Sequence, residues 1–180
     1  MTDPLRVCFV CTGNICRSPT AEAVFSRLVA DAGLADRVLV DSAGTGPWHA
    51  GSDMDQRARH ALVGRGYQPP THVAKQFLAA DFGRRDLVLA LDSGHLSRLG
   101  RLALLAPDPA EAVASLSLLR SFDPAAVEAG DRDVPDPYYD DEHGFELVLD
   151  QVERACAGLA RAVLPRLRSA PAAPPVPVES

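Results

Sequence analysis

The amino-acid sequence predicts an α/β fold: a single domain with a short, twisted parallel sheet of about four strands and helices on both faces. Two observations support this prediction. Short apolar segments alternate along the chain with segments of helical periodicity, a pattern typical of parallel sheets covered on both faces. The chain also has 180 residues, of which 47% are hydrophobic, and this is enough to bury one ordinary core.

The predicted strands are short and the predicted helices are mostly longer. Apolar segments predict strands at 7–10, 38–42, 87–91 and 116–119. Apolar residues at helical spacing, with capping and turn residues at the ends, predict helices at 19–32, from 54 or 55 to 65, 93–99, 110–115 and 145–167. A Gly-rich loop at 43–51 and a long acidic loop at 121–139 connect them. We expect the domain to cover residues 1–168 and the Pro/Ala-rich segment 169–180 to be a disordered tail.

The loop at the end of the first strand is the most informative stretch of the chain. Gly13 and Asn14 readily adopt positive φ, Ser18 is a good helix cap, and Pro19 fits a first helical turn. A loop that closes onto a helix N-terminus gathers backbone N–H groups around one point and so forms an anion site. Parallel sheets bind ligands at the carboxyl ends of their strands, so this loop is expected to bind phosphate.

Two side chains give this loop a chemistry. Cys11 opens it and Arg17 closes it, with five residues between them. A thiol surrounded by N–H groups and a guanidinium favours the thiolate, and a planar guanidinium can hold two phosphate oxygens. A nucleophile at the floor of a phosphate site implies attack on phosphorus through a cysteinyl-phosphate intermediate. The bare Cys-x5-Arg pattern is weak by itself, and the preceding strand, Gly13-Asn14 and the helix start supply its context.

The stretch Cys-Thr-Gly-Asn-Ile-Cys-Arg-Ser at 11–18 resembles the signature of the low-molecular-weight protein tyrosine phosphatases. Further matching blocks are Asp-Ser-Ala-Gly-Thr at 41–45, Thr-His-Val-Ala-Lys at 71–75 and Asp-Pro-Tyr-Tyr at 136–139. The resemblance extends over residues 5–167, and the amino-acid sequence at 43–49 and 119–124 is most similar to the actinobacterial branch of the family. It implies a protein-tyrosine-phosphatase, a hydrolase of phosphoric monoesters.

The resemblance also implies site residues. Cys11 would be the nucleophile, Arg17 would bind phosphate, and Asp136, held extended by the following proline, would be the general acid and base. Cys16 would form a protective disulfide with Cys11 under oxidation. The alternative is that Cys16 only fills space in the loop and has no redox role. The remaining phosphate- and substrate-binding positions would be Thr12, Gly13, Asn14, Ile15, Ser18, Trp48, Tyr138 and Tyr139, with Ser42 and His72 supporting Asn14.

Composition narrows the partners and the compartment. A net charge of −6 argues against nucleic-acid binding, and no basic run suggests a membrane surface. Four cysteines in 180 residues do not form a secreted disulfide framework, and Cys8 and Cys156 lie among apolar residues as core positions. We expect a cytoplasmic monomer without metal or cofactor, with signal-free export left open. Its partners would be phosphotyrosine proteins and a cognate tyrosine kinase.

Three alternatives share parts of this pattern. An arsenate reductase of the same fold needs further cysteines about seventy to eighty residues after the nucleophile, and residues 79–95 contain none. A protein-arginine phosphatase of this fold carries threonine at the position of Ile15, where the bulk of isoleucine favours a flat aromatic ester. A non-catalytic phosphotyrosine-binding module would be expected to lack Cys11 or Asp136. The sequence has no Walker-type motif of a nucleoside triphosphatase.

Overall fold

The computed structural model describes residues 3–168. Four parallel strands form one sheet in the order β2-β1-β3-β4, with β1 at Leu5–Cys11, β2 at Val38–Gly44, β3 at Leu87–Ala90 and β4 at Leu116–Leu118. The predicted fold class is therefore confirmed, and each predicted strand is present within two residues of its expected ends. Because all four strands run in one direction, their carboxyl ends lie along the same edge of the sheet.

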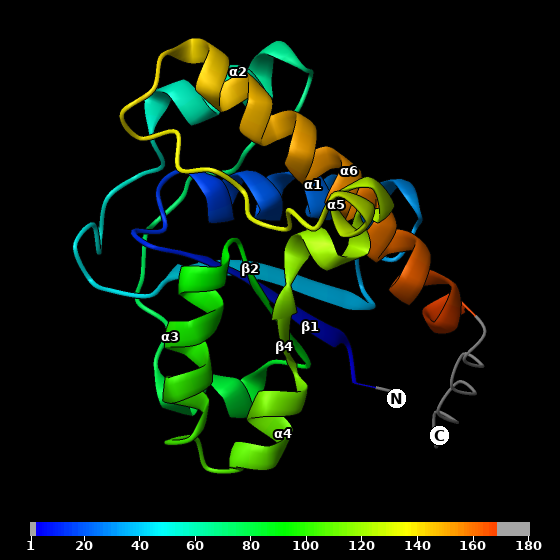
Figure 1. Cartoon of the computed structure of the whole chain (residues 1–180). Helices are drawn as coiled ribbons and strands as arrows, with labels where there is room; N and C mark the ends of the chain where they lie inside the picture. The colour runs from blue at the N-terminus through cyan, green and yellow to red at the C-terminus, as the bar shows by residue number, and fades with distance from the viewer. Residues whose placement is uncertain (1–2, 169–180) are drawn as a thin grey trace, which may run out of the picture.

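Helices cover both faces of the sheet (Figure 1). On one face lie α1, α2 and α6, and on the other lie α3, α4 and the 3₁₀ turn η1. Their bounds are α1 Arg17–Asp31, α2 Gln56–Gly64, η1 Ala79–Arg84, α3 Ser93–Ala103, α4 Pro109–Ala114 and α6 Glu142–Arg168. A second 3₁₀ turn, η2 at Leu119–Phe122, and the short helix α5 at Pro124–Ala129 precede the segment that leads into α6.

The central strand shows why the sheet needs two covers. Val7 and Phe9 point into the apolar layer under α1 and α6, while Cys8 and Val10 point into the layer under α3. All four are fully buried, as strands with continuous apolar sequence require in a parallel sheet. Cys8 is therefore a core residue as predicted. Cys156, on α6, is one as well, and burial raises the pKa of both thiols.

The helix after the loop at 12–16 starts earlier than predicted. It begins at Arg17 rather than at Pro19, with Cys16 in the capping position, so the prediction that Ser18 caps this helix is wrong. Ser18 lies within the first turn, where its hydroxyl points back into the loop and contacts Asn14 and Cys11.

One segment predicted as a loop contains a helix, and one segment without a predicted element contains a 3₁₀ turn. The acidic stretch 121–139 contains α5, capped by the Asp123 side chain and ended by Gly130 at positive φ. The stretch between α2 and β3 contains η1. The predicted tail at 169–180 lies outside the described residues.

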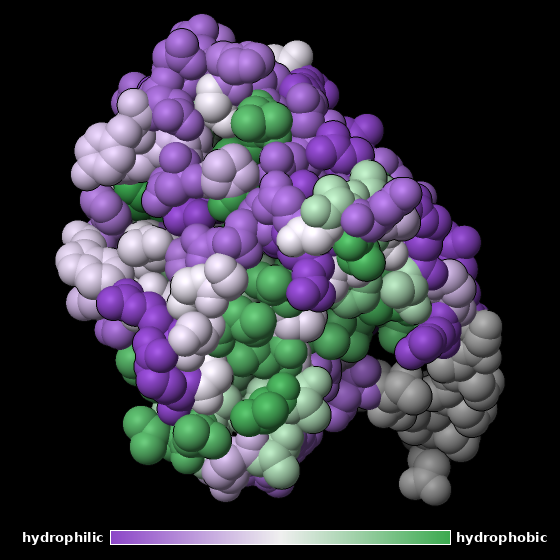
Figure 2. Space-filling model, viewed as in Figure 1, coloured by the Kyte–Doolittle hydropathy of each residue, from purple (hydrophilic) through white to green (hydrophobic). Residues whose placement is uncertain are grey.

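The surface seen in Figure 2 is mostly hydrophilic over α2 and α6, with apolar side chains gathered between α3 and β4 and at the end of α3. Leu104 and Leu105, which follow α3, are among the most exposed large apolar residues. Within residues 3–168, no helix is long and apolar enough to cross a membrane.

Candidate active site

The site lies at the carboxyl edge of the sheet, between β1 and α1. The loop at 12–16 runs from Cys11, the last residue of β1, to Arg17, the first residue of α1. The segment after β2 is tied to this loop, because Thr45 N–H donates to the Cys11 carbonyl at 2.7 Å. The segment after β3 brings Asp92 to the same point. Three consecutive parallel strands thus supply the site from their carboxyl ends.

Cys11 lies at the floor of the loop and is 3% exposed. Its Sγ is 3.1 Å from the Ser18 hydroxyl oxygen. That hydroxyl also accepts a hydrogen bond from Asn14 Nδ2 at 2.9 Å, so its own proton is available to the sulfur or to the Ala43 carbonyl at 3.2 Å. A hydroxyl that can donate to the sulfur stabilises a thiolate and a departing thiolate alike.

Asn14 holds the loop in its shape. It is the one non-glycine residue among the described residues with positive φ, at 58°. Its side-chain amide donates to Ser18 and to Ser42, and its side-chain oxygen accepts from Lys75 N–H. Its carbonyl lies 2.7 Å from His72 Nε2. Ser42 and His72 thus contact Asn14 from behind the loop, in the arrangement that the resemblance implies.

Arg17 is 3% exposed and contacts three segments of the chain: the loop after β1, the segment after β3 and the segment at 134–136. Nη1 donates to Asp92 Oδ2 at 2.8 Å and to the Val134 carbonyl at 3.0 Å. Nη2 donates to Asp136 Oδ2 at 2.9 Å and lies 3.5 Å from the Thr12 hydroxyl. The guanidinium is therefore fixed in one plane against the loop, as bidentate recognition of an anion needs.

A second set of residues stands behind Thr12, and sequence reasoning did not find it. His95 Nε2 lies 2.8 Å from Thr12 Oγ1, and His95 N–H donates to Asp92 Oδ1 at 2.7 Å. Burial lowers the pKa of His95 to about 4, so the imidazole is neutral at neutral pH. Asp92 thus holds Arg17 with one oxygen and the first turn of α3 with the other.

Two glycines, one in the loop and one in the segment after β2, leave room for aromatic side chains of that segment. A Cβ at Gly13 would stand 2.6 Å from the ring of His49, and a Cβ at Gly46 would stand 2.1 Å from the ring of Trp48. Both separations are shorter than any side chain can accept, so glycine is required for these contacts. Sequence analysis assigned Trp48 to the pocket and left His49 aside, and the structure places both rings there.

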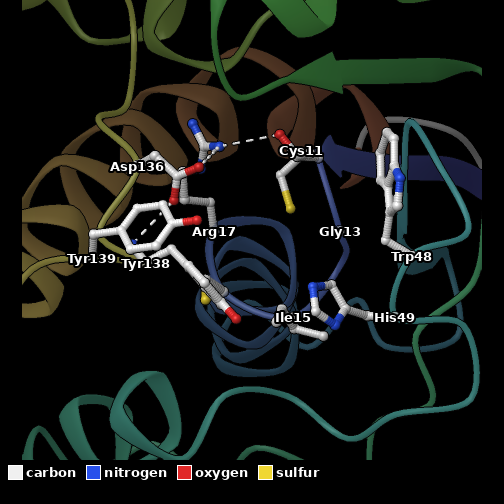
Figure 3. A pocket seen from close by; sticks show the side chains of 11 residues that line it. Cys11, Gly13, Ile15, Arg17, Trp48, His49, Asp136, Tyr138 and Tyr139 are labelled. Atoms are coloured by element: carbon white, nitrogen blue, oxygen red, sulfur yellow. Dashed lines mark hydrogen bonds and ion pairs between the residues drawn. The ribbon is translucent and has the colours of Figure 1, made fainter.

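These elements enclose a pocket of about 310 Å³ (Figure 3). The Cys11 sulfur points into it, with Trp48 on one side and Tyr138 on the other. The side chains that line it are those of the loop, the two walls and the acid: Cys11, Thr12, Gly13, Ile15, Cys16, Arg17, Trp48, His49, Asp136, Tyr138 and Tyr139. Asn14, Ser18, Ser42 and His72 lie behind the loop and do not line the pocket.

Comparison with known proteins agrees with this geometry. The family model described as low molecular weight phosphotyrosine protein phosphatase matches residues 6–169. A low molecular weight protein-tyrosine-phosphatase from Streptomyces coelicolor is 56% identical over 158 residues, which are 88% of this chain and 93% of the relative.

Solved structures agree as well. A crystal structure of a protein tyrosine phosphatase from Entamoeba histolytica superposes with a TM-score of 0.80 at 33% identity, covering 90% of this chain and 98% of that one. A Drosophila arginine phosphatase superposes with a TM-score of 0.79 at 31% identity, covering 88% and 97%.

The chain belongs to the low molecular weight phosphotyrosine protein phosphatase family. It is a phosphatase, and the match to the family model includes the loop at 12–16.

Within this phosphatase, the acidic segment places one carboxylate at the pocket. Asp136 Oδ2 contacts Arg17, and Asp136 Oδ1 accepts from Tyr138 N–H at 3.1 Å. The nearby Asp133 is directed elsewhere, because its two oxygens accept from the backbone N–H and the hydroxyl of Ser93. The geometry therefore separates Asp136 from the other acids of the same segment.

Arg57, on α2, fixes the wall that carries the tyrosines. Its guanidinium donates to the carbonyls of Tyr138 and Asp140 and lies 4.5 Å from the centre of the Phe145 ring. Sequence analysis did not single out this residue. No motif marks it: its ion pair with Asp55 at 2.9 Å is local, and the contacts that reach the pocket wall are to backbone carbonyls 81 and 83 residues away.

Cys16 lies in the same loop as Cys11 with its side chain buried, and both are free thiols. Burial, together with the charge of Asp55, raises the pKa of Cys16. The predicted disulfide between the two cysteines stays a prediction. In the part of the chain that the structure describes, no group of three or more His, Cys, Asp or Glu side chains could hold a metal ion.

Proposed function

We propose that this phosphatase hydrolyses phosphotyrosine in proteins through a cysteinyl-phosphate on Cys11, with Arg17 binding the phosphate and Asp136 acting as general acid and base. One observation carries the proposal most: Asp136 Oδ2 is 2.9 Å from Arg17 Nη2, across 119 residues of sequence. A carboxyl group is thereby held beside the anion-binding loop and above the nucleophile, where a leaving oxygen would emerge.

In the first step, the Cys11 thiolate attacks phosphorus and the bond between phosphorus and the tyrosine oxygen breaks. Backbone N–H groups of the loop and the Arg17 guanidinium hold the phosphate oxygens as charge moves between them. The Asp136 carboxyl donates its proton to the departing phenolate oxygen. The products of this step are tyrosine in the protein and a phosphate ester of the Cys11 sulfur.

In the second step, water attacks phosphorus and the Asp136 carboxylate accepts its proton. The bond between sulfur and phosphorus breaks, and the Cys11 thiolate leaves with the Ser18 hydroxyl donating to it from 3.1 Å. Inorganic phosphate is released and both groups return to their starting protonation states. No metal or cofactor takes part in this scheme.

The walls of the pocket favour an aromatic ester. Trp48 and Tyr138 stand on opposite sides of the Cys11 sulfur, so a tyrosine ring can lie between them with its phosphate at the loop. Ile15 lines the same pocket with an apolar side chain. This surface suits a phenyl ring better than a charged guanidinium, which supports phosphotyrosine over phosphoarginine. We take residues 1–168 as the catalytic domain, acting as a cytoplasmic monomer opposite a tyrosine kinase.

The assignment of Asp136 is tested through the leaving group. Asp136→Ala should slow hydrolysis of phosphotyrosine peptides by roughly a hundredfold or more, because the phenolate then leaves unprotonated. The loss should shrink for p-nitrophenyl phosphate, whose leaving group needs little protonation. Asp133→Ala is the matched control, and it should change neither substrate's kcat, since Ser93 holds that carboxylate. Steady-state kcat and KM on both substrates are the measurement.

Two outcomes would contradict the proposal. If Asp133→Ala showed the leaving-group-dependent loss, the acid would be misassigned. If folded Cys11→Ser kept appreciable turnover, the nucleophile would be misassigned. Faster hydrolysis of a phosphoarginine peptide than of a matched phosphotyrosine peptide by the unaltered protein would assign the other substrate class.

A further inference from the structure

We propose that a groove beside the pocket binds an acidic segment of the phosphotyrosine protein, on the side of the mouth formed by Trp48 and α3. This inference rests on the proposed function, since it names which phosphotyrosine proteins the same site takes. The groove, called here the α3 groove, has a volume of about 290 Å³. Its polar rim is formed by Thr45, Gln76, Arg98 and Arg101.

The α3 groove lies beside the wall of the catalytic pocket. Thr45 lines the groove, and its N–H bonds the carbonyl of Cys11 at 2.7 Å. Trp48 forms the pocket wall, and the Arg98 guanidinium lies 5.7 Å from the centre of its indole ring. A polypeptide whose phosphotyrosine occupies the pocket would therefore reach Arg98 by passing over Trp48.

The two arginines of the groove are exposed and have no carboxylate partner among residues 3–168. Arg101 donates to the Ser97 hydroxyl at 2.9 Å, and the nearest polar contact of Arg98 is Thr45 Oγ1 at 3.5 Å. Asp81, on η1, uses its carboxylate to accept from Leu78 N–H. Two guanidinium groups are thus left for an external anion in a chain whose net charge is −6.

The opposite side of the mouth carries the opposite charge. The chain beyond Tyr139 continues with Asp140, Asp141 and Glu142, all exposed. Arg57 donates to the backbone carbonyl of Asp140 and not to its carboxylate. An acidic peptide is therefore repelled on the Tyr139 side and attracted on the α3 side. This asymmetry gives the bound chain one direction across the mouth.

The apolar floor of the groove can pack against the methylene groups of acidic side chains in a bound peptide and against small apolar residues next to them. Phe77 and Leu99 are buried beneath it, and Leu78 contributes an apolar edge that is 55% exposed. An apolar floor with two cations at the rim matches a Glu or Asp side chain packed along its methylene groups. The occupant we infer is accordingly a stretch with acidic residues close to the phosphotyrosine.

The test compares peptides that differ in flanking charge alone. Phosphotyrosine peptides with Glu, Gln or Lys pairs on one flank, in an N-terminal and a C-terminal series, are measured for kcat/KM with the unaltered protein. The variants are Arg98→Glu and Arg101→Glu, and the matched control is Arg161→Glu on α6, on the other face of the sheet.

In the unaltered protein, we expect the Glu peptide to exceed the Gln peptide by roughly two- to fivefold in one series, as exposed charge pairs allow. The preference should disappear or turn toward Lys in Arg98→Glu and in Arg101→Glu, and persist in Arg161→Glu. It should also weaken as salt is raised. Hydrolysis of p-nitrophenyl phosphate should be unchanged in Arg101→Glu, which does not contact Trp48.

Three results would overturn the inference: no flank preference, a preference that both groove variants retain, or an equal loss on p-nitrophenyl phosphate in Arg101→Glu. A second readout separates this inference from the proposed function. The affinity of Cys11→Ser protein for the same peptides needs no turnover. If the unaltered protein hydrolyses none of the peptides, the proposed substrate class fails, and the affinity series still decides whether the groove selects acidic flanks.

Discussion

The pKa of His95 gives a quantitative test of the network behind the phosphate-binding loop. His95 is 4% exposed, and burial lowers its pKa from 6.5 in a model compound to about 4. The unfolded chain therefore takes up a proton near pH 6.5 that the folded chain accepts only near pH 4. Neutral His95 makes its full contribution to the free energy of unfolding above pH 6.5, and that contribution is lost as the pH falls toward 4.

The expected size follows from these two values. Between pH 7.5 and pH 5.0, the difference in proton uptake lowers the free energy of unfolding by about 2 kcal/mol. His95→Gln keeps a polar side chain near Thr12 and removes the titration. The unaltered protein should therefore lose about 2 kcal/mol more than His95→Gln over this pH range, since the other titrating groups are common to both.

Urea unfolding at the two pH values measures this difference. His60→Gln, which removes an exposed imidazole on α2, is the matched control and should lose as much as the unaltered protein. If His95→Gln and the unaltered protein lost the same free energy, folding would not lower the pKa of His95. The account of a buried imidazole that stays neutral at pH 5 would then be wrong.

Two further predictions concern the pocket itself. Gly46→Ala places a Cβ where the Trp48 ring lies and must displace the ring. The kcat/KM for phosphotyrosine peptides should therefore fall severalfold, while the circular dichroism spectrum stays unchanged. Unaltered kinetics would show that this wall is dispensable. Peroxide should inactivate the enzyme reversibly, and in Cys16→Ser the activity recovered with a thiol reductant should be lower, because oxidation of Cys11 then proceeds to forms that thiols cannot reduce. Equal recovery in the two proteins would count against a protective disulfide.

The parts of the fold that could be predicted are those determined by residues close together in the sequence. Apolar segments of four to five residues gave the strands, and periodic apolar positions gave the helices. Helix α5 was missed because it lies in an acidic, proline-containing stretch that was assigned as a loop, although Asp123, Pro124 and Gly130 mark both of its ends. The lesson is that capping residues locate short helices better than apolar spacing does.

The residues of the site also differ in whether the nearby sequence marks them. Cys11 and Arg17 could be found because one loop carries both, and Asp136 could be found because a proline and two tyrosines mark it. Asp92 and His95 carry no such mark, and their contacts to Arg17 and Thr12 span 75 and 83 residues. Asp92 follows the third strand directly, so the rule that sites gather at carboxyl strand ends could have named it.

The two carboxylates on Arg17 differ in burial, and this difference separates what they do. The Asp92 side chain is 22% exposed and is fixed by the first turn of α3, whereas the Asp136 side chain is 53% exposed on a segment without helix or strand. A buried ion pair costs several kcal/mol to break from one side, so Asp92 keeps the guanidinium oriented. An exposed partner on an irregular segment is exchanged at little cost. Arg17 can therefore exchange Asp136 for an anion in the pocket while Asp92 keeps the guanidinium in place. This is consistent with the proposed role of Asp136 as general acid, which needs the carboxyl to be released from Arg17 beside the leaving oxygen.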